Sequence, residues 1–386
     1  ATLAESLGQF VVTLVGAEKT RNDVLPHIRE HLDLLALEIV EHSARKGSKY
    51  ITRGRSDWYR FFVASLGGGV IVALFSLFKT IMAQWGLPLG IEAILFGLNY
   101  SLCFVLIYLT GSALATKQPA MTASTIAREL GDPYSRTLER LEEMVIRVWR
   151  SQFVSFAGNL AAALPVAFLL SMAFSRLTGA PPAGEEKATY LLEALHPLQS
   201  GTVFYAAAAG FFLFTAGLVS GWIDNRSLHR RIPSRIAEQP ILRSLLGAGG
   251  SRRIADFFDR NFGIIAGNVF LGFALGSLGT VGEILGLPLD IRHIAFASAE
   301  FGTAMESLQF DVATTTIVAV AAGVLLIGLI NFLVSFGLSL GMALESRRVT
   351  WREIRTVASH LGSAFIRRPI DWFWPPRTPV PEKEAA

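Results

Sequence analysis

The chain has 386 residues, of which 51% are hydrophobic and only 17% are charged, and its formal net charge is +4. Soluble domains carry about 25% charged residues, so this composition excludes an ordinary soluble globular protein and indicates a membrane protein. The single cysteine, Cys103, excludes a disulfide framework and a cysteine-based zinc cluster.

Residues 1–56 precede the first apolar segment and are polar, with apolar side chains at helical spacing. We expect cytoplasmic amphipathic helices here, whose apolar faces need a partner. The chain begins at Ala1 and not at a methionine. The partner that we expect is therefore a soluble domain of the same protein that lies upstream of this sequence.

Six later segments are each long and apolar enough to cross a bilayer, which takes about 20 residues of helix. They are Phe61–Phe78, Ala93–Thr116, Ser151–Ser175, Pro197–Ile223, Asn261–Gly282 and Val312–Leu344. The sequence thus predicts an all-α, polytopic membrane domain over residues 57–345, followed by a cytoplasmic tail over residues 346–386.

The orientation of the spans follows from Lys and Arg, which concentrate near cytoplasmic span ends. These residues gather before the first segment, between the second and third, between the fourth and fifth, and after the sixth. The other three connections are acidic and contain only Lys79, Arg176, Lys187 and Arg292 as basic residues. We therefore expect both termini in the cytoplasm and the acidic connections on the outer face.

Short repeats suggest internal duplication. Residues 86–89 and 286–289 both read Gly-Leu-Pro-Leu, and apolar residues recur at matching positions after each copy. The second, fourth and sixth segments share small residues near their ends, a pattern that lets helices approach closely in lipid. We predict three similar two-helix hairpins with close packing at five glycines: Gly111, Gly217, Gly221, Gly337 and Gly341.

Polar side chains inside apolar segments are candidates for function, because an unpaired polar group is costly in hydrocarbon. The amides of this kind are Asn99, Asn159, Asn268 and Asn331. Two interpretations stay open: hydrogen bonds between helices, or the lining of a polar pathway. No Asp, Glu, Lys or Arg is expected deep in a span, which disfavours a proton-coupled pump.

Asp290, Arg292 and His293 follow the second Gly-Leu-Pro-Leu copy and have no counterpart after the first. Carboxylate and imidazole groups at this spacing can bind a divalent metal. Only one histidine is present, however, and Arg292 stands between the two candidate ligands. We favour an Asp290–Arg292 clasp in an outer loop that leads into a re-entrant or short interfacial segment, and we expect neither a metal nor a cofactor.

Arg226, Arg230 and Arg231 lie on the predicted cytoplasmic side, where they suit anionic lipid headgroups. Such charges also contact nucleic-acid phosphates. Membrane topology already explains them, so we expect membrane lipids and not nucleic acid as partners. A homo-oligomer is compatible with the sequence.

Four stretches carry a resemblance to a known family: Leu98–Phe104, Ala115–Ala123, Gly221–Arg226 and Gly286–His293. Through them, nearly the whole chain resembles a bacterial, Gcr-type family of multi-pass membrane proteins that is labelled site-specific recombinase. The resemblance implies the inner membrane of a Gram-negative cell and an amino-terminal region longer than that of this sequence.

Recombinase chemistry requires specific residues. The only His-x-x-Arg of the chain is His42–Arg45, with Tyr50 too near to lie on a separate element, and no alternating strand pattern is visible. We therefore assign no catalytic residue and do not expect an enzyme. Three functions stay open: a permease, channel or lipid-interacting envelope module; a structural anchor for a cytoplasmic domain; and the DNA recombinase that the family name states.

Overall fold

The computed structural model describes residue 52 and residues 54–114, 138–346 and 351–375. Within these ranges the regular elements are helices, and no strand occurs. Six helices in the described part of the chain are long and apolar enough to cross a membrane. They are α3 (Arg55–Met82), α4 (Leu89–Leu109), α6 (Leu138–Thr178), α8 (Thr202–His229), α10 (Pro240–Leu285) and α12 (Thr314–Ser346).

These helices confirm the prediction of an all-helical chain with six apolar segments. The helices α6 and α10 begin well before the predicted segments, at Leu138 and Pro240, and two other helix ends lie several residues inside them. The second span ends at Leu109 and not at residue 116, because Gly111 adopts a left-handed φ of +70°. The fourth begins at Thr202 and not at Pro197, because residues 196–201 connect it to a preceding helix.

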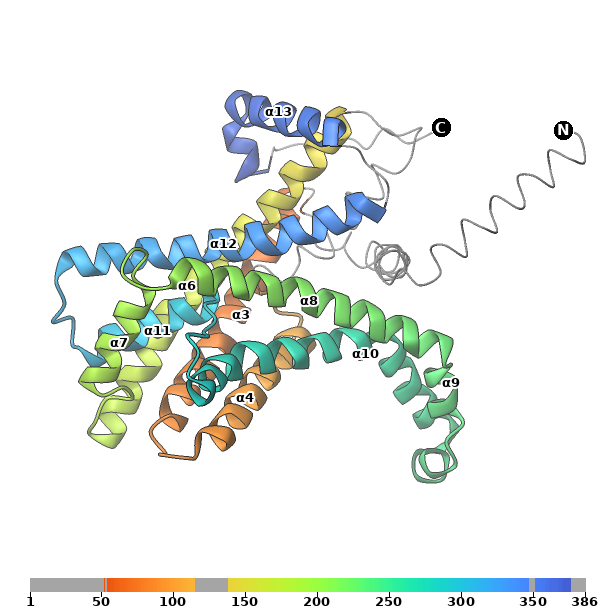
Figure 1. The fold of residues 1–386 in the computed structure, drawn as a ribbon. Helices are drawn as coiled ribbons and strands as arrows, with labels where there is room; N and C mark the ends of the chain where they lie inside the picture. The colour runs from red at the N-terminus through yellow and green to blue at the C-terminus, as the bar shows by residue number, and fades with distance from the viewer. Residues whose placement is uncertain (1–51, 53, 115–137, 347–350, 376–386) are drawn as a thin grey trace, which may run out of the picture.

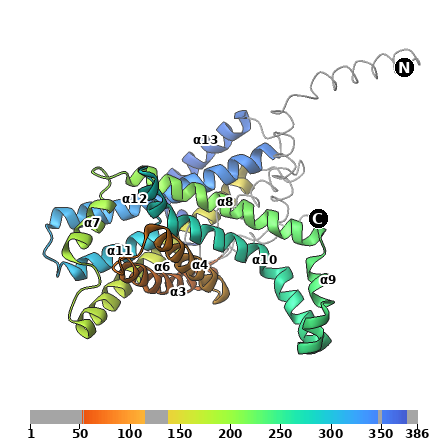
Figure 2. The same ribbon diagram turned by 60° about the horizontal axis from the view of Figure 1, so that its bottom comes forward.

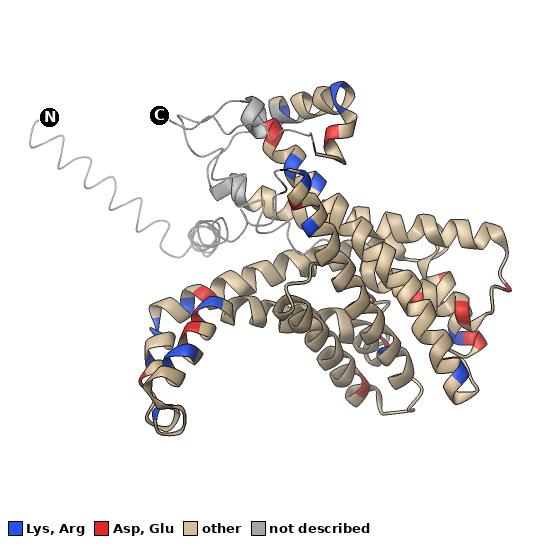
Figure 3. Cartoon of the chain, turned by 180° about the vertical axis from the view of Figure 1, so that it is seen from behind, with Lys and Arg blue, Asp and Glu red and all other residues tan. Residues whose placement is uncertain are grey.

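Shorter elements lie at the two ends of the bundle (Figure 1). The acidic end, where α3, α6 and α10 finish, contains two helices too short to span a bilayer, α7 (Glu185–Leu195) and α11 (Ile294–Ser307). The opposite end, called here the arginine-rich end, contains α9 (Ile232–Ala237), α13 (Trp351–Arg367) and the 3₁₀ turn η2 (Pro369–Trp372). Figure 3 shows Lys and Arg residues, in blue, along α9 and the adjoining part of α10.

The spans do not pack as three separate hairpins. The main partners of α6 are α3 and α11, the main partner of α4 is α10, and α8 packs against α10 and α12. Direct contact between α6 and α8, and between α10 and α12, is sparse in the described parts of the chain. The reason is that α7 and α11 fold back into the bundle, where α11 packs against α6, α7, α3 and α12 (Figures 1 and 2).

Helix α11 is the short segment expected before the sixth span, and it is buried rather than interfacial. Eleven of its 14 residues are buried, among them Phe296 and Phe301. Since an unpaired backbone is not tolerated in hydrocarbon, a chain that re-enters the bundle must do so as a helix or line a protein-enclosed space. Apolar contacts with α6, α7 and α12 supply that enclosure.

The two Gly-Leu-Pro-Leu stretches share one feature, a glycine in the left-handed region. The φ angle is +61° at Gly86 and +64° at Gly286. Beyond that glycine they differ. Residue 89 begins the span α4 directly, whereas residues 287–293 continue as irregular chain and the short helix α11 starts only at Ile294. The similar sequences therefore encode similar turns but not equivalent hairpins.

Close packing of backbones occurs where spans of different predicted hairpins cross. In α10, Gly272 lies against the backbone of Ser101 and Gly276 against that of Phe96, both in α4. In α3, Gly69 lies against Ala162 of α6, where a Cβ would come within 2.8 Å of the alanine Cβ. Glycine is needed at these crossings because a side chain would separate the helices.

Candidate functional site

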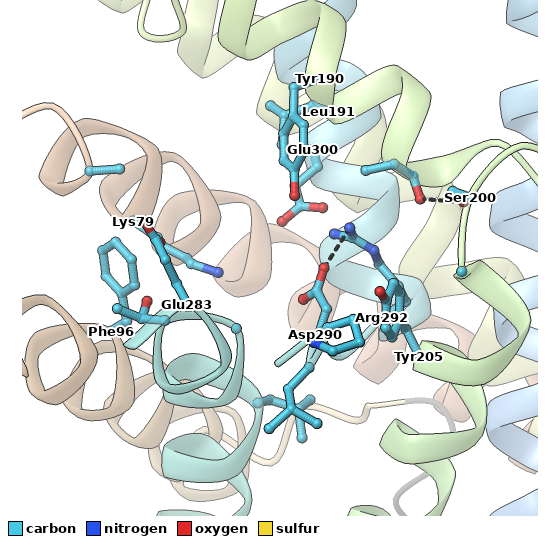
Figure 4. A pocket seen from close by; sticks show the side chains of 18 of the residues that line it. Lys79, Phe96, Tyr190, Leu191, Ser200, Tyr205, Glu283, Asp290, Arg292 and Glu300 are labelled. Atoms are coloured by element: carbon cyan, nitrogen blue, oxygen red, sulfur yellow. Dashed lines mark hydrogen bonds and ion pairs between the residues drawn. The ribbon is translucent and has the colours of Figure 1, made fainter. Parts of the chain in front are cut away.

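A cavity of about 600 Å³ opens among the helices of the acidic end. Its walls come from α3, α4, α7, α8, α10 and α11 and from the loop at residues 287–292 (Figure 4). The lining is strongly polar, with five carboxylates and three cations. They are Glu92, Glu193, Glu283, Asp290, Glu300, Lys79, Lys187 and Arg292.

The centre of the site is the pair formed by Asp290 and Arg292, whose carboxylate and guanidinium are 2.6 Å apart. The prediction of a clasp between them is confirmed. The Asp290 Oδ1 also accepts a hydrogen bond from the Ile291 backbone N–H at 2.7 Å. The pair is largely buried: the Arg292 side chain is 10% exposed and that of Asp290 26%. It is thus part of the cavity wall and not a surface contact.

Arg292 is held from several sides. Its backbone N–H donates to the Tyr205 carbonyl oxygen at 3.2 Å, and its guanidinium lies 5.9 Å from the centre of the Tyr205 ring. Burial opposes the charge, yet Asp290, Glu300 and a hydrogen bond with the Tyr190 side chain together raise the pKa of Arg292. Its Nε has no hydrogen-bond partner among the described residues. This Nε is itself buried, so it is an unsatisfied donor within the wall of the cavity.

Lys79 and Glu300 bring further charge to the same cavity. Lys79, one turn before the end of α3, places its Nζ 5.2 Å from the Phe96 ring centre and 5.0 Å from that of Tyr100. These distances are within the range of cation–π attraction. Glu300, on α11, faces Lys79 and Arg292 across the cavity (Figure 4). No ion pair within 4.0 Å occurs between Glu300 and either cation in the described structure.

A second, small space of about 30 Å³ shares Asp290, Arg292 and Glu300 with the cavity wall and is lined also by Tyr100, His293 and Phe296. Below it, the rings of Tyr100 and Phe296 stack with their centres 3.8 Å apart, and the Phe104 ring packs edge-on against Phe296 at 5.8 Å. Tyr100 lies 11 residues, or about 16 Å, from the start of α4. The polar space thus penetrates well into the bundle and ends at an aromatic floor.

His293 and Asn331 fix the start of α11 beside this floor. The His293 ring nitrogen Nδ1 accepts a hydrogen bond from the Ala295 N–H at 3.3 Å, so this histidine caps the helix. The Asn331 Nδ2 donates to the carbonyls of Arg292 and Ala206, and its Oδ1 accepts from the Ile294 N–H. His293 is 2% exposed and is therefore a structural neighbour of the site.

The other predicted amides lie outside the cavity lining. Asn159 of α6 donates to the carbonyls of Ser65 and Ala113, and Asn99 of α4 donates to that of Phe75. These contacts, like those of Asn331, match the interpretation as hydrogen bonds between helices. Asn268 is fully buried, and neither its Oδ1 nor its Nδ2 has a partner among the described residues.

Close packing at Gly111, Gly337 and Gly341 is contradicted. A Cβ placed at any of the three would meet no atom within 4 Å. The reason is that Gly111 lies beyond the end of α4, while Gly337 and Gly341 lie on the exposed face of α12. Gly217 and Gly221 lie within α8, where Gly221 is buried.

Arg226, Arg230 and Arg231 lie at the arginine-rich end and are exposed. The Arg226 guanidinium sits 5.4 Å from the centre of the Trp222 ring. His42, Arg45 and Tyr50 fall outside the described residues. Within the described ranges, no group of three or more His, Cys, Asp or Glu side chains is arranged to hold a metal ion.

Sequence reasoning found Asp290 and Arg292 but missed several cavity residues. Lys79 was visible only as a cation near a span edge, and Tyr190 and Tyr205 gave no signal. Glu300 was counted among the outer acids, yet it is the only charged residue between Ile294 and Met305. A lone carboxylate in such an apolar run was the signal for a buried functional position.

Comparison with known proteins gives one match. A family model described as "Site-specific recombinase" matches residues 2–375. Neither the curated proteins nor the solved structures contain a match to the chain.

Proposed function

The chain belongs to the site-specific recombinase family, and we propose that this member is a permease of the bacterial inner membrane that binds a small polar solute. The observation that carries the proposal is the charged cavity of about 600 Å³ at the acidic end. Ligand pockets in proteins typically measure about 300–1,000 Å³. A partly open space of this size and polarity at the end of an apolar bundle has the properties of a solute site.

The charges of the cavity indicate the solute class. Asp290 and Arg292 neutralise each other, so the remaining lining has four carboxylates and two lysines. A cleft with an excess of one charge concentrates ligands of the opposite charge. The substrate that fits is a small solute with at least one ammonium group, and Lys79 and Lys187 can accommodate an acidic group if the solute is zwitterionic.

The short helices support a transport role. Secondary transporters often place their substrate site beside interrupted or half-length helices, where rigid parts can move around a fixed site. Here α7 and α11 both line the cavity, and α11 carries Phe296 of the aromatic floor. Passage of a solute requires that the Tyr100–Phe296 stack separate, which a shift of α11 relative to α4 would accomplish.

The orientation is part of the same proposal. The exposed arginines near the ends of α8 and α10 lie opposite the cavity. Since basic residues mark the cytoplasmic side, the cavity opens to the outer face of the membrane. A solute would then enter from the periplasm.

Uptake by proteoliposomes tests the function. Radiolabelled putrescine, glycine and glutamate represent a cation, a zwitterion and an anion. We expect faster uptake of putrescine or glycine than of glutamate. Glu300→Gln should slow uptake by about 10- to 150-fold, since a charge-assisted hydrogen bond contributes about 1.5–3 kcal/mol.

Glu185→Gln is the matched control, because Glu185 is exposed and lies outside the cavity lining. Its uptake should equal that of the unchanged chain. The permease proposal would be contradicted if no solute entered faster than it enters protein-free vesicles. It would also be contradicted if both variants lost uptake equally.

A structural anchor is the second candidate, and one observation favours it. Arg150, 1% exposed, donates to the carbonyls of Thr52 and Asp371 and so joins the chain before α3 to η2. This forms a fixed platform at the arginine-rich end. Arg150→Gln should release η2 and so speed cleavage by trypsin after Arg367, at the end of α13, without changing uptake; an unchanged cleavage rate would show that Arg150 does not assemble the platform.

A further inference from the structure

The arginine-rich end has a projecting arm that the solute site does not involve. It comprises α9 and the start of α10, residues 232–260, and extends from the bundle beyond the end of α8 (Figures 1 and 2). Ser251 of α10 donates to the carbonyls of Ile236 and Ala237, which fastens the two helices to each other. The arm is therefore a folded unit.

Apolar side chains are unusually exposed at its tip. Ile241 is 64% exposed, Leu245 75% and Leu246 51%. They precede Gly247, whose φ of +69° and ψ of 174° interrupt α10 and set residues 240–246 apart from the rest of the helix. Phe257 and Phe258 continue the exposed apolar surface toward the bundle.

Positive charge surrounds these side chains. The arm and the connection before it hold seven arginines and three acids: Arg230, Arg231, Arg235, Arg243, Arg252, Arg253, Arg260, Glu238, Asp256 and Asp259. All of them are exposed. Basic residues interleaved with exposed apolar ones are the combination by which helices bind the surface of an anionic bilayer.

We propose that this arm lies on the cytoplasmic face of the membrane, with Ile241, Leu245 and Leu246 inserted among the acyl chains and the arginines on anionic lipid phosphates. The arm continues directly from two spans, α8 and α10, so the bilayer surface is within its reach. At its base the Trp222 ring, 46% exposed, contacts Arg226, an arrangement typical of the headgroup level. The arm would anchor the bundle laterally and make its function dependent on anionic lipid.

Spin-label accessibility tests the contact. In a Cys103→Ser background, Leu245→Cys carries the label in nanodiscs of phosphatidylcholine alone or with one third phosphatidylglycerol. We expect collisions with a water-soluble nickel chelate to fall about threefold when the anionic lipid is present, because the label then lies below the headgroups. Replacing Arg243, Arg252 and Arg253 by Glu should abolish this difference.

The matched control is Thr178→Cys, an exposed position at the opposite end of the bundle. Its label should remain equally accessible in both lipids. Equal nickel access at residue 245 in both lipids would overturn the proposal. Dipolar broadening between two labels would also overturn it, because it indicates a second copy bound to the arm. The same holds if a DNA duplex, and not the anionic lipid, shields the label at residue 245 from the nickel chelate.

Discussion

Asn331 is the side chain on which the position of α11, and hence the shape of the cavity, depends most. It is fully buried and holds three backbone groups: the carbonyl of Arg292 at 2.9 Å, that of Ala206 at 2.8 Å and the N–H of Ile294 at 3.1 Å. The Ile294 N–H begins α11 and has no partner within the helix. Removing the amide therefore leaves buried backbone groups unsatisfied.

The expected cost follows from these three bonds. A hydrogen bond between membrane helices contributes about 0.6 kcal/mol on average, and a typical buried one about 0.5–1.5 kcal/mol. Asn331→Ala should therefore lower the free energy of unfolding by about 2–4 kcal/mol.

Asn99→Ala is the matched control because it removes the same atoms from another span. The Asn99 Nδ2 donates one hydrogen bond among the described residues, to the Phe75 carbonyl at 2.9 Å, and its Oδ1 is buried there without a partner. Its loss should cost about 1 kcal/mol or less, since deleting an unsatisfied oxygen also relieves a penalty.

The measurement is reversible unfolding in mixed detergent micelles, followed by the far-ultraviolet circular dichroism of the helices. The two variants and the unchanged chain are compared at the same detergent ratio. If Asn331→Ala is no more destabilising than Asn99→Ala, the argument that Asn331 fixes α11 is refuted.

Two further predictions concern packing and charge. The double variant Asp290→Arg with Arg292→Asp should retain more stability than either single variant. The expected coupling energy is about 1.5–3 kcal/mol because the two groups are largely buried. A double-mutant cycle in the same micelles measures it, and additive losses of stability would exclude the clasp. Gly272→Ala should destabilise the bundle by about 1–3 kcal/mol because its Cβ would fall on the Ser101 backbone. Gly337→Ala, which meets no atom within 4 Å, should be neutral or stabilising by up to about 1 kcal/mol, and equal effects would contradict the assigned crossing.

The spans could be predicted because hydrophobic length is a local property of the chain. Helix α7 was assigned to an outer loop, since its 11 residues include Glu185 and Glu186 and are too few to give a span signal. Its burial comes from tertiary contacts of Leu191, Leu192 and Leu195 that no local pattern records.

The roles of the amides and glycines could be narrowed from the sequence but not assigned. Asn159 and Asn331 bind backbone carbonyls, and every residue type offers such acceptors, so the partner leaves no mark in the sequence. A glycine matters only where another helix crosses it. Gly272 meets α4 whereas Gly337 meets nothing, although both lie in small-residue patterns.

The charged motif could be located from the sequence because it follows only one of the two Gly-Leu-Pro-Leu copies. Asp290 and Arg292 are close in sequence, so their contact is local and could be expected. Their meeting with Lys79 and Glu300 depends on how α3 and α11 pack, and that arrangement became visible only in the fold.

Cysteine labelling in intact cells tests the outward-facing cavity most directly, because the single native cysteine is buried. Thr80 lines the cavity, Ser76 lies one turn away and is 2% exposed, and Thr110 is exposed beyond the opposite end of α4. With a membrane-impermeant thiol reagent, Thr80→Cys should react from outside, Thr110→Cys only after permeabilisation, and Ser76→Cys in neither case. Labelling of Thr110→Cys from outside, with Thr80→Cys protected, would contradict the orientation, and no reaction at residue 80 on either side would contradict the cavity.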